Sequence, residues 1–423
     1  MQPDPSTSTS RRPGRRVLLL VAAALVVALA AGLVGLARAD DRVAAAVDRV
    51  TADAPMSVGD RTALDALWRV YKETYLEPGT NRTLDKQNDD ITTSEGQSYT
   101  MMRAVWSDDL ATFRASWQWT KDNLQRPDFL MSWRFGERPD GTYGVQTEVG
   151  GDNTATDADV DIAFSLLMAY QRWQDDTFLY DALPIINSIW DEEVVAVGGR
   201  PVLVANDLEQ DDRDRVLLNP SYFAPYAYRV FAEVDDDPTH DWSAVVDSSY
   251  EILAELDAAP LDTATSAGLA PDWVFLDRRT GAYSAVSDTL TTRFSYDALR
   301  SPWRLALDLE WNAEPRARAL LEEQDVLADD WRTDGRLVAA YSRDGSPAAD
   351  YEAPAMYGGT MGFFATVEPE LATEVYQDEL LPVYDADTGN LTTDLGYYDS
   401  NWVWFGMALY LDQLPDLTEV SAP

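Results

Sequence analysis

From about residue 57 onward, apolar and polar positions alternate with the 3.6-residue period of amphipathic helices, and polar loops separate the helical stretches. The pattern predicts twelve helices. Their expected starts lie near residues 58, 95, 109, 155, 177, 219, 240, 295, 314, 353, 370 and 396. Residues 274–286, VFLDRRTGAYSAV, differ because two short β-prone runs flank Thr280-Gly281. They predict a small β-hairpin.

The order of these helices restricts the fold class to all-α. They do not alternate with strands, no motif recurs at a fixed period, and no linker divides residues 57–415. Two all-α architectures fit this order: a helical solenoid, or six helical hairpins closed into a ring. Unusual polar residues stand at the start of every second helix, namely Glu95, Asp157, Asn219 and Asp297. Since alternate helices of an up-and-down array point the same way, we expect a six-hairpin (α/α) barrel with these residues at its mouth.

The N-terminal region follows a different pattern. Residues 1–16 are basic and polar, and residues 17–37 form an uninterrupted apolar run of 21. This length predicts a transmembrane anchor whose N-terminus lies in the cytoplasm, because arginines precede it and aspartates follow it. Ala37-Arg38-Ala39 leaves a cleaved signal peptide as the alternative. Both interpretations predict an extracytoplasmic domain after a linker at 38–56, with a tail at 416–423.

Charge and composition exclude several classes of function. The net charge is −40, from 73 acidic and 33 basic residues, which argues against nucleic acid as a partner. The chain has no cysteine, and its one histidine is His240. Multi-histidine and cysteine metal centres are therefore excluded, and acid–base chemistry falls mainly to carboxylates. We expect no cofactor and no metal, and a monomer.

Two motifs place carboxylates at predicted helix starts. In ITTSEGQSYTMM, residues 91–102, Ser94 and Gln97 have the spacing of a capping box, so Glu95 is either a first-turn residue or a functional acid. ATDAD, residues 155–159, begins an acidic run that alternates as in a calcium loop. The glycine and glutamate that an EF-hand needs are absent, since Ile162 and Met168 occupy those positions. Three aspartates within five residues exceed what helix capping requires.

A third motif supplies a second carboxylate with a cation. In FSYDALRSPW, Asp297 and Arg300 stand three residues apart, and the simplest interpretation is an ion pair on one helix. Considered together with Glu95, the chain offers two carboxyl groups in different surroundings. Cleavage of a glycosidic bond needs such a pair, one to donate a proton and one to activate water or attack carbon.

Several of these motifs together resemble glycoside hydrolase family 8. The resemblance rests on SEGQSYTM, ATDADVDIAFSLL, NPSYF, PDWV, SYDALR and YYDSNWVWFGMAL, whose order covers residues 57–412. It implies an inverting hydrolase of β-1,4-linked polysaccharide, with cellulose favoured and xylan, chitosan and mixed-linkage glucan as alternatives. A catalytically silent surface protein that binds polysaccharide is the alternative from another class.

The resemblance also implies a role for each residue. Glu95 matches the general acid and Asp297 the general base. Asp157 matches the carboxylate that holds the distorted sugar, a position also described as nucleophile. The implied substrate-binding residues are Tyr222, which helps to hold the water, Trp133, which stacks on a sugar, and Arg300, which binds substrate or orients Asp297. Thr100 replaces a glycine common in the family, and we expect it to narrow the cleft.

Overall fold

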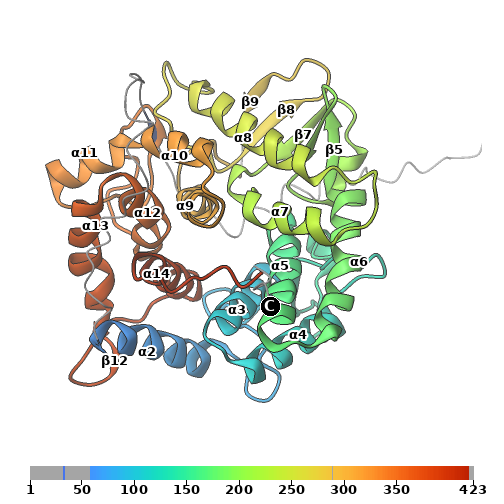
Figure 1. The fold of residues 1–423 in the computed structure, drawn as a ribbon, viewed down its shortest axis with the longest axis horizontal. Coiled ribbons are helices and arrows are strands. Elements are labelled where there is room, and N and C mark those ends of the chain that lie inside the picture. The colour runs from blue at the N-terminus through green and yellow to red at the C-terminus, as the bar shows by residue number, and fades with distance from the viewer. Residues whose placement is uncertain (1–31, 34–57, 288, 419–423) are drawn as a thin grey trace, which may run out of the picture.

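A computed structural model describes residues 32–33, 58–287 and 289–418 and shows a ring of helices (Figure 1). Six helices form the inner ring, and each packs against the next until the last meets the first. In ring order they are α3 (Ser94–Trp106), α5 (Thr156–Trp173), α7 (Pro225–Val234), α9 (Arg300–Asn312), α12 (Pro354–Val367) and α14 (Tyr397–Tyr410). The predicted closed ring is confirmed, and every second predicted helix does form its inner layer.

The remaining helices lie outside this inner ring (Figure 1). They are α2 (Val58–Tyr75), α4 (Leu110–Asn123), α6 (Asp176–Glu193), α8 (Trp242–Ala258), α10 (Pro315–Glu322), α11 (Asp325–Asp334) and α13 (Pro369–Val375). The single helix expected from residue 314 is in fact two, α10 and α11. Helices α7 and α9 also begin later than expected, because a 3-10 turn at Pro220–Tyr222 and a turn at 296–299 precede them.

Glycines let α12 approach its two inner neighbours closely. A Cβ on Gly358 would lie 2.0 Å from the Trp402 carbonyl oxygen of α14, and one on Gly362 would lie 2.1 Å from the Pro302 oxygen of α9. Both distances are far below van der Waals contact, so any larger residue would force the backbones apart. Helix α12 therefore holds α9 and α14 close together.

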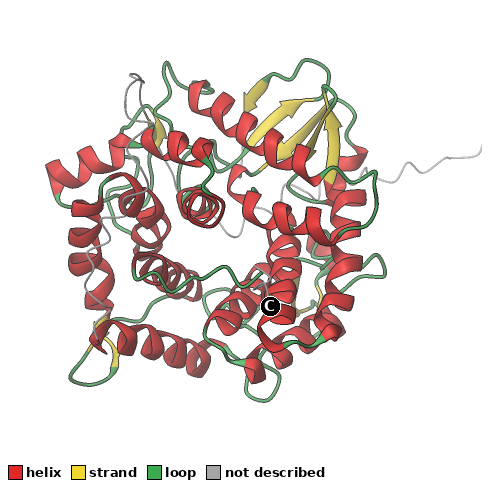
Figure 2. Cartoon of the chain, viewed as in Figure 1, coloured by secondary structure: helices red, strands yellow, loops and turns green. Residues whose placement is uncertain are grey.

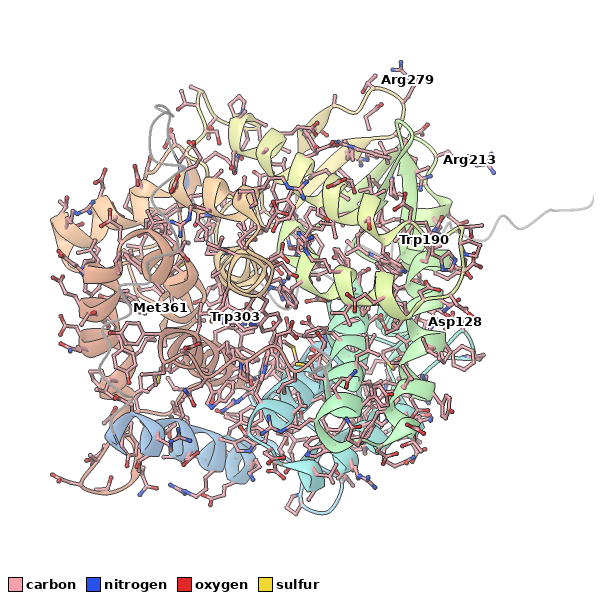
Figure 3. All side chains as sticks on the ribbon, viewed as in Figure 1. Asp128, Trp190, Arg213, Arg279, Trp303 and Met361 are labelled. Carbon is pink, nitrogen blue, oxygen red and sulfur yellow. The ribbon has the colours of Figure 1, made fainter. Side chains whose placement is uncertain are left out.

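An aromatic core joins α3, α9 and α14 beneath their N-termini. Trp303 of α9 contacts Trp106 of α3 and Trp402 of α14 edge to face, with ring centroids 6.2 and 5.7 Å apart. Phe405 packs against Trp303 at 5.2 Å. Side chains from the inner helices, Trp303 among them, project into the space that the ribbon leaves open (Figure 3). Because large aromatic pairs favour defined geometries, this core fixes how the three helices meet.

The ring of helices also carries small β-sheets (Figure 2). The predicted hairpin is confirmed as β8 (Val274–Asp277) and β9 (Tyr283–Ala285), with Gly281 in its turn at φ 70°. Strand β7 (Arg215–Leu218) extends it to three strands. The other strands are β2 (Thr92–Thr93), β3 (Arg134–Glu137), β4 (Tyr143–Val145), β5 (Val194–Val197), β6 (Arg200–Leu203), β11 (Tyr384–Asp385) and β12 (Asn390–Leu391).

The predicted anchor or signal, residues 17–37, lies outside the described residues except for two positions. Gly32–Leu33 form strand β1, paired in parallel with Ser342–Arg343 of β10, which differs from the helix expected there. In the parts of the chain that the structure describes, no helix is long and apolar enough to cross a membrane.

Candidate active site

Glu95 lies in the first turn of α3, at the end of the inner ring where several helix N-termini meet. The residue that caps this helix is Thr93, whose hydroxyl accepts from the Gly96 N–H at 3.0 Å. The expected capping box of Ser94 and Gln97 is therefore wrong. Gln97 instead accepts from the Thr83 N–H at 2.7 Å, which leaves the side chain of Glu95 free of any capping role.

The Glu95 carboxylate accepts hydrogen bonds on both oxygens. Arg300 Nη1 donates to Oε2 at 2.9 Å, and the Tyr397 hydroxyl donates to Oε1 at 2.6 Å. The Glu95 side chain is 13% exposed. Burial raises the pKa of Glu95, and the negative charge of Asp297 adds to this, while Arg300 and Tyr397 act in the opposite direction. Burial dominates, so the site favours a protonated Glu95.

Asp297 lies in the turn before α9, three residues from Arg300, and it is held by three N–H donors. Arg300 Nη2 and Asn219 Nδ2 donate to Oδ1 at 2.6 and 2.9 Å, and Trp273 Nε1 donates to Oδ2 at 2.9 Å. The predicted ion pair is confirmed, although a turn and not a helix positions it. Both oxygens of Asp297 therefore act as hydrogen-bond acceptors.

Arg300, the first residue of α9, connects the three carboxylates. It is 1% exposed, and its guanidinium makes ion pairs to Glu95 at 2.9 Å, Asp157 at 3.0 Å and Asp297 at 2.6 Å. One cation faces three acidic groups. If all three were ionised, the buried cluster would carry a net charge of −2, which is costly in a poorly solvated site. The arrangement therefore favours retention of a proton by one of the three carboxyl groups.

The three aspartates of the acidic run at the start of α5 have separate partners. Asp157 contacts Arg300, and its Oδ1 is buried without a partner among the described residues. Burial raises its pKa to about 7, with a further contribution from Glu95. Asp159 accepts from the Met131 N–H at 2.8 Å, and Asp161 forms a bidentate pair with Arg304 at 2.8 and 2.7 Å. Among the three, Asp157 belongs to the Arg300 cluster.

The two aromatic residues predicted to bind substrate lie in different places. The Tyr222 ring lies 5.2 Å from the Arg300 guanidinium, and burial together with the charges of Asp157 and Asp297 raises the pKa of its hydroxyl. Trp133 is linked to this cluster through Ser94, the residue that precedes Glu95. Its carbonyl accepts from Ser94 N at 3.0 Å, while its half-buried indole donates to the Gly150 oxygen at 2.9 Å.

Four residues of the site were given no chemical role in the sequence analysis, although Asn219 was expected at the barrel mouth. Asn219 and Trp273 bind the Asp297 carboxylate, Tyr397 binds Glu95, and buried Asp272 accepts from the Asp297 backbone at 3.2 Å. All four lie within the motifs NPSYF, PDWV and YYDSN, so the signal was present. What the motifs did not show was which side chain of each faces the cluster.

The structure also bears on the expectations for Thr100, His240 and metal binding. Thr100 does not narrow a cleft, because its buried hydroxyl bonds with those of Tyr71 and Thr83 at 2.7 and 2.8 Å on the α2 side of α3. His240 stacks on Trp190 at 5.0 Å and contacts Asp235 at 2.8 Å, in the outer layer. Among the described residues no group of three or more His, Asp or Glu is arranged to hold a metal ion.

Comparison with known proteins places this geometry in a family. A model of "Glycosyl hydrolases family 8" matches residues 46–400. A "probable endoglucanase" of Novacetimonas hansenii is 34% identical over 242 residues, which cover 56% of this chain and 64% of that relative. The chain thus matches less than two thirds of that relative's length.

Solved structures share the same fold. An endo-β-1,4-glucanase of Acetobacter xylinum superposes with a TM-score of 0.64 at 25% identity, over 84% of this chain and 99% of that one. A β-1,3-1,4-glucanase of Paenibacillus sp. X4 gives 0.69 at 23% identity, over 84% and 94%. Because the family model matches most of the length of this chain, the chain belongs to glycosyl hydrolase family 8.

Proposed function

We propose that this protein is an inverting endo-β-1,4-glucanase. The observation that carries the proposal is the Arg300 cluster, in which one buried cation faces three carboxyl groups with different hydrogen-bond partners. A polysaccharide-binding protein has no need for a carboxyl group whose pKa is raised, and which can donate a proton, beside a second carboxyl group that acts as an acceptor. Acid–base cleavage of a glycosidic bond needs both.

In the proposed reaction, Glu95 is the general acid and Asp297 the general base. A water molecule attacks the anomeric carbon while Asp297 takes one of its protons. The bond from that carbon to the glycosidic oxygen breaks, and Glu95 gives its proton to the departing oxygen. The β-linked sugar is released as the α-anomer, because water attacks from the face opposite the leaving group.

The other members of the cluster are assigned to the sugar and the water. Asp157 has a buried oxygen that finds no partner in the described parts of the chain, so this oxygen is suited to accept a hydrogen bond from a hydroxyl of the distorted sugar. The Tyr222 hydroxyl, close to both aspartates, suits it to hold the attacking water. Arg300 orients Asp297 by its contact at 2.6 Å, and half-buried Trp133 is assigned to stacking on a sugar further along the chain.

The substrate is the part of the proposal that depends on relatives. The name of the Novacetimonas protein supports a glucan, and that of the Acetobacter protein supports β-1,4-glucan. The Paenibacillus structure supports mixed-linkage β-1,3-1,4-glucan as the second candidate. The test is the release of reducing ends from carboxymethylcellulose, mixed-linkage glucan, xylan and chitosan, side by side. We expect carboxymethylcellulose to be cleaved fastest. Fastest cleavage of xylan or chitosan would replace the substrate, and no cleavage would overturn the activity.

The stereochemical outcome tests the mechanism independently of the substrate. Proton NMR of the first product should show the α-anomer, which then equilibrates with the β-anomer by mutarotation. Initial appearance of the β-anomer would mean a retaining mechanism, for which the two carboxyl groups lie about 5–5.5 Å apart.

We also propose that the catalytic domain acts outside the cytoplasm. Residues 17–37 either anchor it in the membrane or are cleaved as a signal peptide, which releases it. The apolar run and the arginines before it support this. If the run stays attached, the protein should remain in the membrane fraction after a high-salt wash and leave it only with detergent. A soluble form that begins near Asp40 would support cleavage instead.

A further inference from the structure

Asp272 is a fully buried carboxylate, next in sequence to a residue that binds the proposed base. It precedes strand β8, and its own backbone N–H donates to the Arg293 oxygen at 2.6 Å. Its side chain is directed at the turn that carries Asp297 and makes its hydrogen bonds there. The proposed reaction has so far given it no role.

Four donors of that turn converge on the Asp272 carboxylate. Oδ1 accepts from three backbone N–H groups, those of Ser295 at 3.0 Å, Asp297 at 3.2 Å and Ala298 at 2.8 Å. Oδ2 accepts from the Ser295 hydroxyl. A carboxylate that accepts several N–H bonds of one turn defines the conformation of that turn.

This arrangement fixes the turn before α9. Helix α9 begins at Arg300 without a side-chain cap from Leu299, and the N–H groups of Arg300 and Ser301 donate to the Asp297 and Ala298 carbonyl oxygens of that turn. An N-cap residue normally satisfies such groups from the preceding position. Here Asp272 satisfies the N–H groups of the preceding turn from a segment more than twenty residues earlier in the chain.

The neighbouring residue acts on the same target. Trp273 Nε1 donates to Asp297 Oδ2 at 2.9 Å. Two consecutive residues therefore hold Asp297. Asp272 binds the backbone N–H of Asp297, and Trp273 binds the carboxylate of Asp297. We propose that Asp272 is a positioning residue for the base, which fixes the Asp297 turn so that the carboxylate meets the attacking water in line with the anomeric carbon. This inference rests on the proposed function.

The test compares turnover with binding in three variants. Asp272→Ala removes all four acceptor contacts, and a small misplacement of a catalytic group costs about 10²-fold, so we expect kcat on cellopentaose to fall by about that factor. The dissociation constant for cellopentaose, measured calorimetrically, should change less than about 3-fold, because the sugar does not touch Asp272. Asp272→Asn keeps an acceptor oxygen for the three N–H groups and should recover about 10-fold of the loss.

Asp235→Asn is the matched control. Asp235 is also a buried carboxylate, and it accepts from His240 and Trp242 at 2.8 Å each, away from the Arg300 cluster. It should lose stability without a comparable loss of kcat. If Asp272→Ala does not fold, Ser295→Ala removes one donor and should lower kcat by several-fold. Folded Asp272 and Ser295 variants with the parent kcat would overturn the inference, as would a loss of binding equal to the loss of turnover. A parent protein that cleaves no β-glucan would instead overturn the proposed function.

Discussion

The surroundings of Glu95 and Asp297 differ in a way that separates two chemically similar groups. Asp297 accepts three N–H bonds, from a cation, an amide and an indole. Glu95 accepts from the same cation but has a tyrosine hydroxyl as its other partner. A neutral hydroxyl also hydrogen-bonds to a protonated carboxyl group, whereas three N–H donors demand an acceptor. The difference in donors therefore agrees with the proposed roles, in which Glu95 donates a proton and Asp297 accepts one.

The largest effects should come from removing either carboxyl group. Glu95→Gln and Asp297→Asn keep the shape of each side chain but abolish proton donation and acceptance, and each should lower kcat by about 10²–10⁴-fold. Both variants should still bind cellopentaose. Near-normal turnover by Glu95→Gln on carboxymethylcellulose would exchange or cancel the assigned roles.

Trp273→Phe removes one of the three donors to Asp297 and keeps an aromatic ring against Tyr222. A hydrogen bond to a charged group contributes about 1.5–3 kcal/mol, so we expect kcat to fall by about 10-fold or more. Trp331→Phe is its control, since that indole donates to Glu374 at 3.0 Å in the outer layer. Equal kinetic effects of the two substitutions would show that the indole donor has no specific role.

Tyr397→Phe should change the pH profile more than the maximum rate. The Tyr397 hydrogen bond lowers the pKa of Glu95, so its removal should raise that pKa further. An acid must be protonated to act, and activity is lost as pH rises through its pKa. The alkaline limb of kcat should therefore move to higher pH, with a several-fold loss of rate. Tyr376→Phe, which removes a hydroxyl that donates to Asp60 at 2.7 Å, should leave the limb in place.

The smallest effect concerns stability and a buried acid outside the cluster. Burial raises the pKa of Glu193 to about 8, above the value of about 4.3 in an unfolded chain. Its protonated form therefore stabilises the fold fully below the unfolded pKa, and this contribution is lost as pH rises through the folded pKa. Glu193→Gln should raise the Tm near pH 8.5 by about 2–4 °C and change it less near pH 5. Exposed Glu251→Gln should show no such pH-dependent gain.

Periodicity predicted the helices, because amphipathic helices of this length carry their burial pattern in the sequence, and the polar residues at the start of every second helix favoured the ring. It failed where short-range conformations intervene. The turn at 296–299 contains good helix formers, yet the Asp272 contacts hold it outside α9. The split between α10 and α11 likewise has no proline or glycine to mark it.

The site was predictable at the level of motifs but not of contacts. Residue type and position singled out Glu95 and Asp297, the family resemblance singled out Asp157, and Arg300 contacts all three. Many partners of these groups come from distant segments, such as Tyr397, which lies 302 positions from Glu95, and side-chain direction at a helix N-terminus is set by tertiary packing. The three aspartates at the start of α5 illustrate this, because each meets a partner from a different segment that packs around the helix.

The contact between Tyr397 and Glu95 joins residues 302 positions apart and belongs to the last helix of the ring. During synthesis, a chain that has emerged only as far as α9 contains Arg300 and the residues of the three carboxyl groups, but Tyr397, the hydroxyl partner of Glu95, is still missing. We expect such partial chains to be catalytically impaired. After denaturation, full activity should consequently return only when the final helix docks. The recovery of activity should therefore be slower than the recovery of helical content.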